Sequence, residues 1–126
     1  MVNIKETTEE ARQAFDEIID LLTALPATKL NEIPFEGSWT AGQLGQHIIL
    51  SAGGFVEVIN GPTSETKRDP EEKVQAIRGM FLDFSFKMKS PESIVPEEKQ
   101  YQLIALLEKL LDIKEKFLAS IKTLDL

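Results

Sequence analysis

Hydrophobic residues recur three and four positions apart over long stretches of this chain, which is the spacing of an amphipathic helix. Four such stretches cover residues 8–25, 41–59, 69–89 and 97–122. Proline or glycine interrupts the pattern between them, and only Ile33 and Phe35 alternate with polar neighbours as a short extended piece would. The pattern predicts an all-α protein, an up-down four-helix bundle in which residues 1–126 form a single domain.

Three combinations of polar residues mark the predicted helix starts. Thr7 with Glu10, and Thr40 with Gln43, have the spacing of a capping box, in which the first side chain caps the helix and the second reaches back to the cap. The third start is predicted at Asp69, because aspartate is a favoured cap and the proline that follows fits the first helical position.

The apolar stripes of the second and third stretches are expected to face the bundle core. They consist of Leu44, Ile48, Ser51, Phe55 and Val58 in the second stretch, and of Val74, Ile77, Phe81, Phe84 and Met88 in the third. The residues predicted to meet in one core are Leu44, Phe55, Ile77, Phe81, Leu107 and Leu110. Two glycines, Gly53 and Gly54, lie inside the second stretch and indicate either a weak turn or the close approach of a backbone or a ligand.

The composition excludes several classes of protein. The formal net charge is −7 and the basic residues are scattered, so no nucleic-acid partner is expected. The chain has no cysteine, which excludes disulfides, thiolate metal sites and a cysteine nucleophile, and which fits a cytoplasmic protein. No signal-peptide pattern is visible and no apolar run approaches the length of a membrane span, so we expect no association with a membrane.

His47 is the main candidate for chemistry, because the chain contains no phosphate-binding loop, dinucleotide-binding fingerprint or nucleophile elbow. It is the only histidine, and the only tryptophan, Trp39, precedes it. A helix that starts at Thr40 places His47 about two turns in, and the predicted pocket around it includes Trp39, Gln43 and Ser51. We expect a half-buried, inward-facing imidazole, because His47 shares a side of the helix with Leu44 and Ser51; the alternative is a solvated face. Spacing alone leaves open whether His47 is a hydrogen-bonded packing residue or a ligand, because a catalytic zinc site uses three protein ligands.

The Trp-Thr-x-x-Gln-x-x-x-His pattern from Trp39 to His47, within this order of helices, resembles the DinB/YfiT-like superfamily. The resemblance implies a helical bundle that binds a divalent metal, zinc or nickel, through three histidines, of which His47 matches one. In that family the other two lie in a later helix with a His-x-x-x-His pair, which these 126 residues do not contain. The chain therefore resembles the N-terminal portion of a family member, without the family's C-terminal helix.

The resemblance also implies a function, a metal-dependent thiol S-transferase or hydrolase in which the metal lowers the pKa of a thiol or of water. It implies a small-molecule or thiol substrate and a homodimer. With one ligand, His47, we expect zinc or nickel to bind this chain weakly or not at all. Two alternatives remain: a non-catalytic helical module that binds a partner helix, itself or a small apolar ligand, and an acidic structural bundle with no site.

Overall fold

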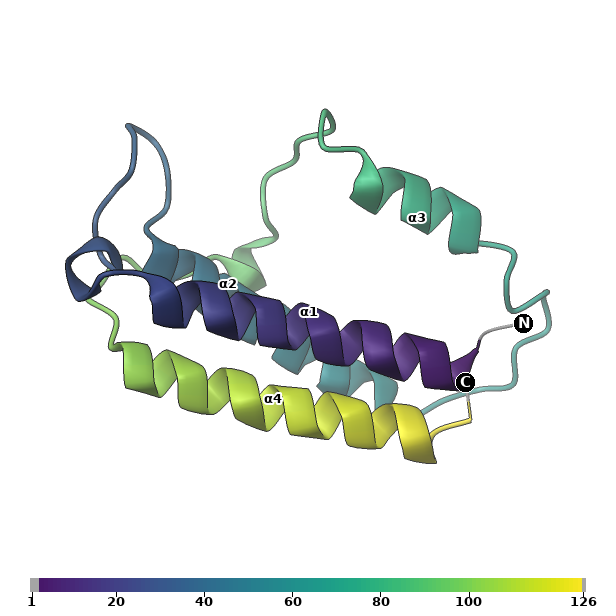
Figure 1. The fold of residues 1–126 in the computed structure, drawn as a ribbon. Coiled ribbons are helices and arrows are strands. Elements are labelled where there is room, and N and C mark those ends of the chain that lie inside the picture. The colour runs from purple at the N-terminus through teal and green to yellow at the C-terminus, as the bar shows by residue number, and fades with distance from the viewer. Residues whose placement is uncertain (1–2, 126) are drawn as a thin grey trace.

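The computed structural model describes residues 3–125, and in this range the chain folds into helices joined by irregular segments, with no strand (Figure 1). The four α-helices are α1 (Ile4–Ala24), α2 (Ala41–Ile59), α3 (Val74–Leu82) and α4 (Leu103–Thr123). Two short 3-10 helices, η1 (Ala27–Lys29) and η2 (Glu92–Ile94), lie in the connections. Successive α-helices run in opposite directions (Figure 1), so the prediction of an all-α, up-down arrangement is confirmed.

The predicted start of α2 is confirmed in atomic detail. The Thr40 hydroxyl accepts a hydrogen bond from the backbone N–H of Gln43 at 3.0 Å, and the Gln43 side-chain carbonyl accepts one from the backbone N–H of Thr40 at 2.9 Å. Each residue therefore satisfies an amide that the first turn of a helix leaves without a partner. The helix then continues without a break through Gly53 and Gly54 to Ile59.

The predicted start of α1 is wrong by one turn. The helix begins at Ile4, and its cap is Asn3, whose side-chain oxygen accepts a hydrogen bond from the backbone N–H of Glu6 at 3.1 Å. Thr7, the expected cap, lies inside the helix. An asparagine caps a helix as effectively as a threonine does, so the helix can begin after Asn3 instead of after Thr7.

The predicted start of α1 lies too late, whereas those of α3 and α4 lie too early. α3 begins at Val74 rather than at Asp69, because the Asp69 carboxylate accepts a hydrogen bond from the backbone N–H of Glu71 and closes a local turn. α4 begins at Leu103 rather than at residue 97. Before it, the Asn31 side chain accepts from the backbone N–H of Tyr101 at 2.7 Å and donates to its carbonyl at 2.9 Å. These two bonds use the N–H and the carbonyl of Tyr101, which would have to bond within the helix if α4 began earlier.

The packed core is formed by three of the four helices, with α4 in contact with both α1 and α2. Leu110 of α4 is completely buried, and Leu106, also on α4, lies against the backbone of Gly45 on α2. An aromatic row joins the three helices, because the Phe117 ring lies 5.7 Å from that of Phe15 and 5.8 Å from that of Phe55. The buried members of the core are Phe15, Leu22, Leu30, Ile49, Tyr101, Leu106, Leu110 and Ile113.

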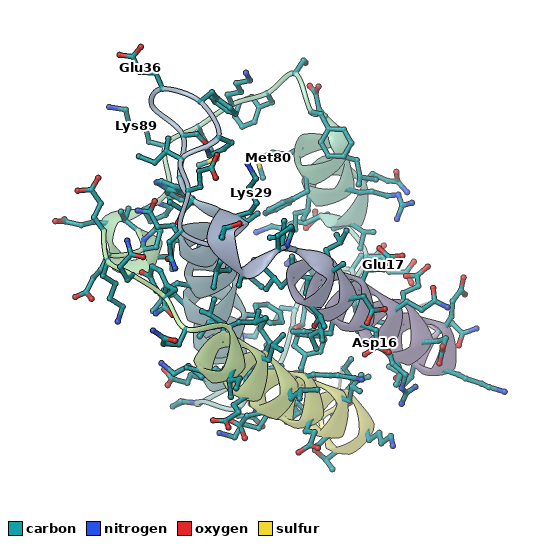
Figure 2. The ribbon with its side chains drawn as sticks, turned by 60° about the vertical axis from the view of Figure 1, so that its left-hand side comes forward. Asp16, Glu17, Lys29, Glu36, Met80 and Lys89 are labelled. Carbon is teal, nitrogen blue, oxygen red and sulfur yellow. The ribbon has the colours of Figure 1, made fainter. Side chains whose placement is uncertain are left out.

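α3 does not take part in this core, which corrects the predicted packing. Figures 1 and 2 both show α3 standing clear of α1, α2 and α4, and every residue from 62 to 89 is exposed. Ile77 and Phe81, which were expected in the core, are 49% and 72% exposed. Leu44 and Phe55 of α2 are 44% and 51% exposed, so only Leu107 and Leu110 of the predicted set pack inside. The predicted stripe of the third stretch is also too long, because Phe84 and Met88 lie beyond the end of α3 at Leu82.

Candidate functional site

His47 lies two turns into α2 and is half-buried, as its position in the helix led us to expect. Its Nδ1 atom lies 2.8 Å from the backbone carbonyl oxygen of Ile94, at the end of η2. A carbonyl oxygen can only accept a hydrogen bond, so Nδ1 carries the proton and donates it. In the neutral imidazole, Nε2 is then the nitrogen with the free lone pair, which is the atom able to bind a metal or accept a proton.

Trp39 forms the second part of the site. Its ring centroid lies 5.1 Å from that of His47, and the two rings are tilted by 48°. Trp39 directly precedes the cap residue Thr40, so the capping box that starts α2 also places the indole beside the imidazole. A tilted contact between aromatic rings at this distance is a favourable packing arrangement. The structure thus brings together the two residues that the sequence singled out.

A surface hollow adjoins this pair on the side of the loop before α2. Its volume is about 370 Å³, and it is lined by Pro34, Ser38, Trp39, Thr40, Ala41 and Leu44. It lies where the loop meets the first turn of α2, so it is a hollow beside Trp39 rather than a cavity between packed helices. Its volume is at the lower end of the range of small-molecule pockets.

Gln43 and Ser51, the other two predicted pocket residues, are engaged in hydrogen bonds within α2. The side-chain carbonyl of Gln43 accepts from the backbone of Thr40 in the capping box, and the residue is buried. The Ser51 hydroxyl donates to the backbone carbonyl of His47 at 2.8 Å. Both side chains therefore hold the helix that carries His47.

The donor set around His47 does not fit a closed metal site. Across residues 3–125, no three side chains of histidine, cysteine, aspartate or glutamate lie close enough together to hold a metal ion. Catalytic zinc sites use three protein ligands and structural ones four. The described part of the chain therefore offers one well-oriented imidazole and not a complete coordination sphere.

Sequence reasoning missed the partner of His47 because that partner is a backbone atom. In the segment of residues 91–96, Ile94 is half-buried and supplies the carbonyl, whereas its neighbour Val95 is 46% exposed. A backbone carbonyl is the same in every residue type, so no pattern of side chains could indicate it. The only available signal was the cluster of prolines, which predicts an irregular segment without saying where it packs.

Tyr101 lies between the end of this segment and α4. It is buried, and its hydroxyl donates to the backbone carbonyl of Glu97 at 2.7 Å. Burial, and after it the negative charge of Glu97, raises the pKa of the Tyr101 phenol above its ordinary value. The Tyr101 side chain also packs closely on Gly42, since a methyl group built there would lie 2.9 Å from the tyrosine Cβ. Tyr101 therefore ties the start of α2 to the segment that carries Ile94.

The sequence model of the DinB superfamily matches residues 7–126. The chain belongs to the DinB superfamily. This membership confirms the resemblance inferred from the segment between Trp39 and His47, and a DinB fold agrees with the helical structure. Comparison with curated proteins and with solved structures gives no match. In the part of this DinB chain that the structure describes, no helix is both long enough and apolar enough to cross a membrane.

Proposed function

We propose that this DinB-superfamily chain contributes one metal ligand, His47, to the site of a metal-dependent hydrolase or thiol S-transferase. The observation that supports this proposal is the hydrogen bond from His47 Nδ1 to the carbonyl of Ile94. Metal-binding histidines commonly donate their second ring nitrogen to a carbonyl or carboxylate, which fixes the tautomer and the direction of the ring. The residues packed around His47 would not supply the remaining ligands. In the family, those ligands are two histidines of another helix.

The residues of the chain itself would orient the imidazole and limit its access to water. The carbonyl of Ile94 keeps the proton on Nδ1, and Trp39 packs against the ring at 5.1 Å between centroids. The hollow beside Trp39 offers a place for a small substrate, which by the resemblance is a thiol or another small molecule. Each of these roles depends on the capping box of Thr40, which holds Trp39 and the first turns of α2 together.

Titration with Ni²⁺ tests whether His47 is a ligand. Trp39 is the only tryptophan, so its fluorescence reports on the neighbouring imidazole, and amide NMR signals of α2 locate the ion. We expect weak binding that quenches Trp39 emission and broadens signals around residue 47, because a single imidazole cannot close a site. His47→Gln should remove both effects. Glu57→Gln, which removes an exposed carboxylate from the same helix, is the matched control and should change neither.

Two results would contradict the proposal. If Ni²⁺ at high concentration left the signals around residue 47 unchanged, His47 would not be an accessible ligand. If the chain held Ni²⁺ tightly and stoichiometrically, with loss in His47→Ala, the site would have further ligands from carboxylates or from another copy, and the one-ligand assignment would be wrong.

A second candidate function is a helical module that binds a partner helix, a second copy of itself or a small apolar ligand. The observation that favours it is the exposure of α3 and of the residues that follow it, where Phe81, Phe84 and Met88 are 72%, 87% and 71% exposed. Exposed apolar side chains in such number on a folded protein are typical of a site of interaction. This candidate does not involve His47, so the two proposals can be tested separately.

A further inference from the structure

Asn31 joins two parts of the chain that lie far apart in sequence. Its side-chain carbonyl accepts a hydrogen bond from the backbone N–H of Tyr101 at 2.7 Å, and its amide NH₂ donates one to the backbone carbonyl of Tyr101 at 2.9 Å. A peptide N–H can only donate and a peptide carbonyl can only accept, so these bonds also fix which way round the amide lies. Tyr101 is buried, so without Asn31 both backbone groups would lose their partners in a place with little access to water.

Asn31 is itself held against the helix that carries His47. The carbonyl of the preceding residue, Leu30, accepts a hydrogen bond at 2.8 Å from the backbone N–H of Gly42 in the first turn of α2. Leu30 is buried, and the Tyr101 side chain packs on the same glycine. Figure 1 shows the connection after α1 and the start of α4 at the same end of the molecule. Asn31 and Tyr101 therefore have a fixed position relative to the start of α2.

The Tyr101 side chain holds the chain close to Ile94 as well. Its hydroxyl donates to the backbone carbonyl of Glu97 at 2.7 Å, which closes part of the segment on itself. Pro96, next to Glu97, is buried, and its ring fixes the backbone angle φ. Only one residue then separates Pro96 from Ile94, whose carbonyl accepts the hydrogen bond from His47 Nδ1 at 2.8 Å. The position of that carbonyl therefore depends on where Tyr101 is held.

We propose that Asn31 is a positioning residue for His47: it fixes the segment of residues 94–101 and thereby the carbonyl of Ile94 that keeps the imidazole proton on Nδ1. The inference rests on the proposed function, in which Nε2 of His47 is the metal-binding atom. A carbonyl that moved away would leave the proton free to occupy Nε2, and a protonated ring nitrogen has no lone pair for a metal ion. In this role Asn31 acts through the segment and not by binding the imidazole.

The competing interpretation is that Asn31 only stabilises the fold, and Asn60 allows the two to be separated. Asn60 also makes two side-chain hydrogen bonds, since it donates to the hydroxyl of Ser120 on α4 at 2.8 Å and to the backbone carbonyl of Val56 at 2.9 Å. These bonds lie at the C-terminal end of α2, about 20 Å from His47 along the helix. Asn60→Ala is therefore the matched control, because it loses the same number of side-chain hydrogen bonds away from the segment.

NMR spectra of the imidazole nitrogens test the proposal in the metal-free protein. His47 is the only histidine, so the two ring ¹⁵N signals belong to it. At a pH at which the ring is neutral, the wild type should show a protonated Nδ1 and an Nε2 with a free lone pair. In Asn31→Ala the two signals should move towards each other, because a ring without a fixed partner exchanges between both tautomers. Asn60→Ala should keep the wild-type signals.

Asn31→Asp provides a second variant of nearly the same shape. Its carboxylate can still accept from the backbone N–H of Tyr101 but cannot donate to the carbonyl. It should therefore move the ring signals in the same direction as Asn31→Ala does, and it decides the question if the alanine variant does not fold. Circular dichroism shows which of the variants are folded.

Titration with Ni²⁺ then connects the tautomer to metal binding. Asn31→Ala should raise the Ni²⁺ concentration that quenches half of the Trp39 emission by about tenfold, which is the lower end of the loss expected when the partner of a metal-binding histidine is removed. Asn60→Ala should leave this concentration unchanged.

Two results would overturn the inference. Wild-type ring signals in Asn31→Ala or in Asn31→Asp would show that the carbonyl of Ile94 stays in place without both bonds of Asn31. An equal change in Asn60→Ala would show a general loss of stability instead of positioning. Both results come from metal-free protein, so a wild-type chain that does not respond to Ni²⁺ contradicts only the proposed function. Unchanged ring signals in a chain that binds Ni²⁺ contradict only the role of Asn31.

Discussion

At the scale of single residues, side chains that bind backbone atoms decide where segments without regular structure lie. Asn31 makes two hydrogen bonds to the backbone of Tyr101, across 70 positions of the sequence, and His47 makes one to Ile94, across 47. These bonds hold the chain between α3 and α4 onto α2, through His47, and onto the connection before α2, through Asn31. A buried polar group costs free energy unless it is paired, so each of them also selects a single arrangement of the segment.

Tyr101 provides a prediction about pH at this scale. Its phenol has a raised pKa, with burial as the larger cause and Glu97 as the smaller, so the folded chain keeps a proton that the unfolded chain loses. The contribution to stability is complete below the unfolded pKa of about 10, and the free energy of unfolding should fall as pH rises beyond it. Tyr101→Phe should lower stability at neutral pH by about 1 kcal/mol, through the lost hydrogen bond, and reduce the loss at alkaline pH.

Two measurements check this prediction. Tyr101 is the only tyrosine, so the ultraviolet absorbance of the ionised phenol titrates it directly in the folded protein. Urea unfolding of the wild type and of Tyr101→Phe at neutral and at alkaline pH gives the difference in stability. An ordinary phenol titration in the folded chain would contradict the assignment.

At the scale of elements, the glycines of α2 differ in the space around them: Gly42 is closely packed, and Gly54 is open. A methyl group at Gly42 would lie 2.9 Å from the Cβ atom of Tyr101, which is closer than real side chains approach. At Gly54 it would meet nothing within 4 Å. Of the two sequence interpretations of the Gly53-Gly54 pair, a weak turn is not needed, since the helix is continuous. A methyl group built at Gly53 would lie 3.5 Å from Ile113 Cδ1, which is an ordinary contact distance.

A pair of substitutions tests this contrast. Gly54→Ala should raise the free energy of unfolding by roughly 1 kcal/mol, because alanine has the higher helix propensity and space is available. Gly42→Ala should lower it, because Tyr101 and the bonds around it would have to move. Urea unfolding at a concentration low enough to keep the protein monomeric measures both. If the two variants changed stability in the same direction, the close packing of Gly42 on Tyr101 would be in doubt.

At the scale of the whole molecule, stability comes from the contacts of α1, α2 and α4, and α3 adds little within one chain. Leu110→Ala removes a completely buried side chain and should cost about 2–5 kcal/mol. Phe81→Ala, at a position that is 72% exposed, should change the free energy of unfolding of the monomer by less than about 0.5 kcal/mol. Chemical unfolding at low protein concentration measures the two values. A large loss for Phe81→Ala under these conditions would show that α3 packs within its own chain.

The sequence by itself determined the local features of this protein. The 3.6-residue periodicity placed four helices, the Thr40–Gln43 box placed the start of α2, and the spacing from Trp39 to His47 indicated both the family and the pair of rings that lie together. These features depend on residues within about two turns of each other, and neighbouring residues are sufficient to specify them.

Only the tertiary structure decided which apolar faces are covered. The stripes of α3 and of α2 have the same periodicity as those of the core, but periodicity shows that a face is apolar and not what packs on it. The start of α4 was decided in the same way, by the bonds between Asn31 and Tyr101, which are 70 residues apart. The start of α3 is different, because the turn at Asp69 that precedes it is local. The partner of His47 is a carbonyl 47 residues away, which only the folded chain brings to the imidazole. Which faces are covered, and which backbone atoms side chains bind, depends on contacts between residues far apart in sequence. The free energy of such contacts depends on the complete packed arrangement.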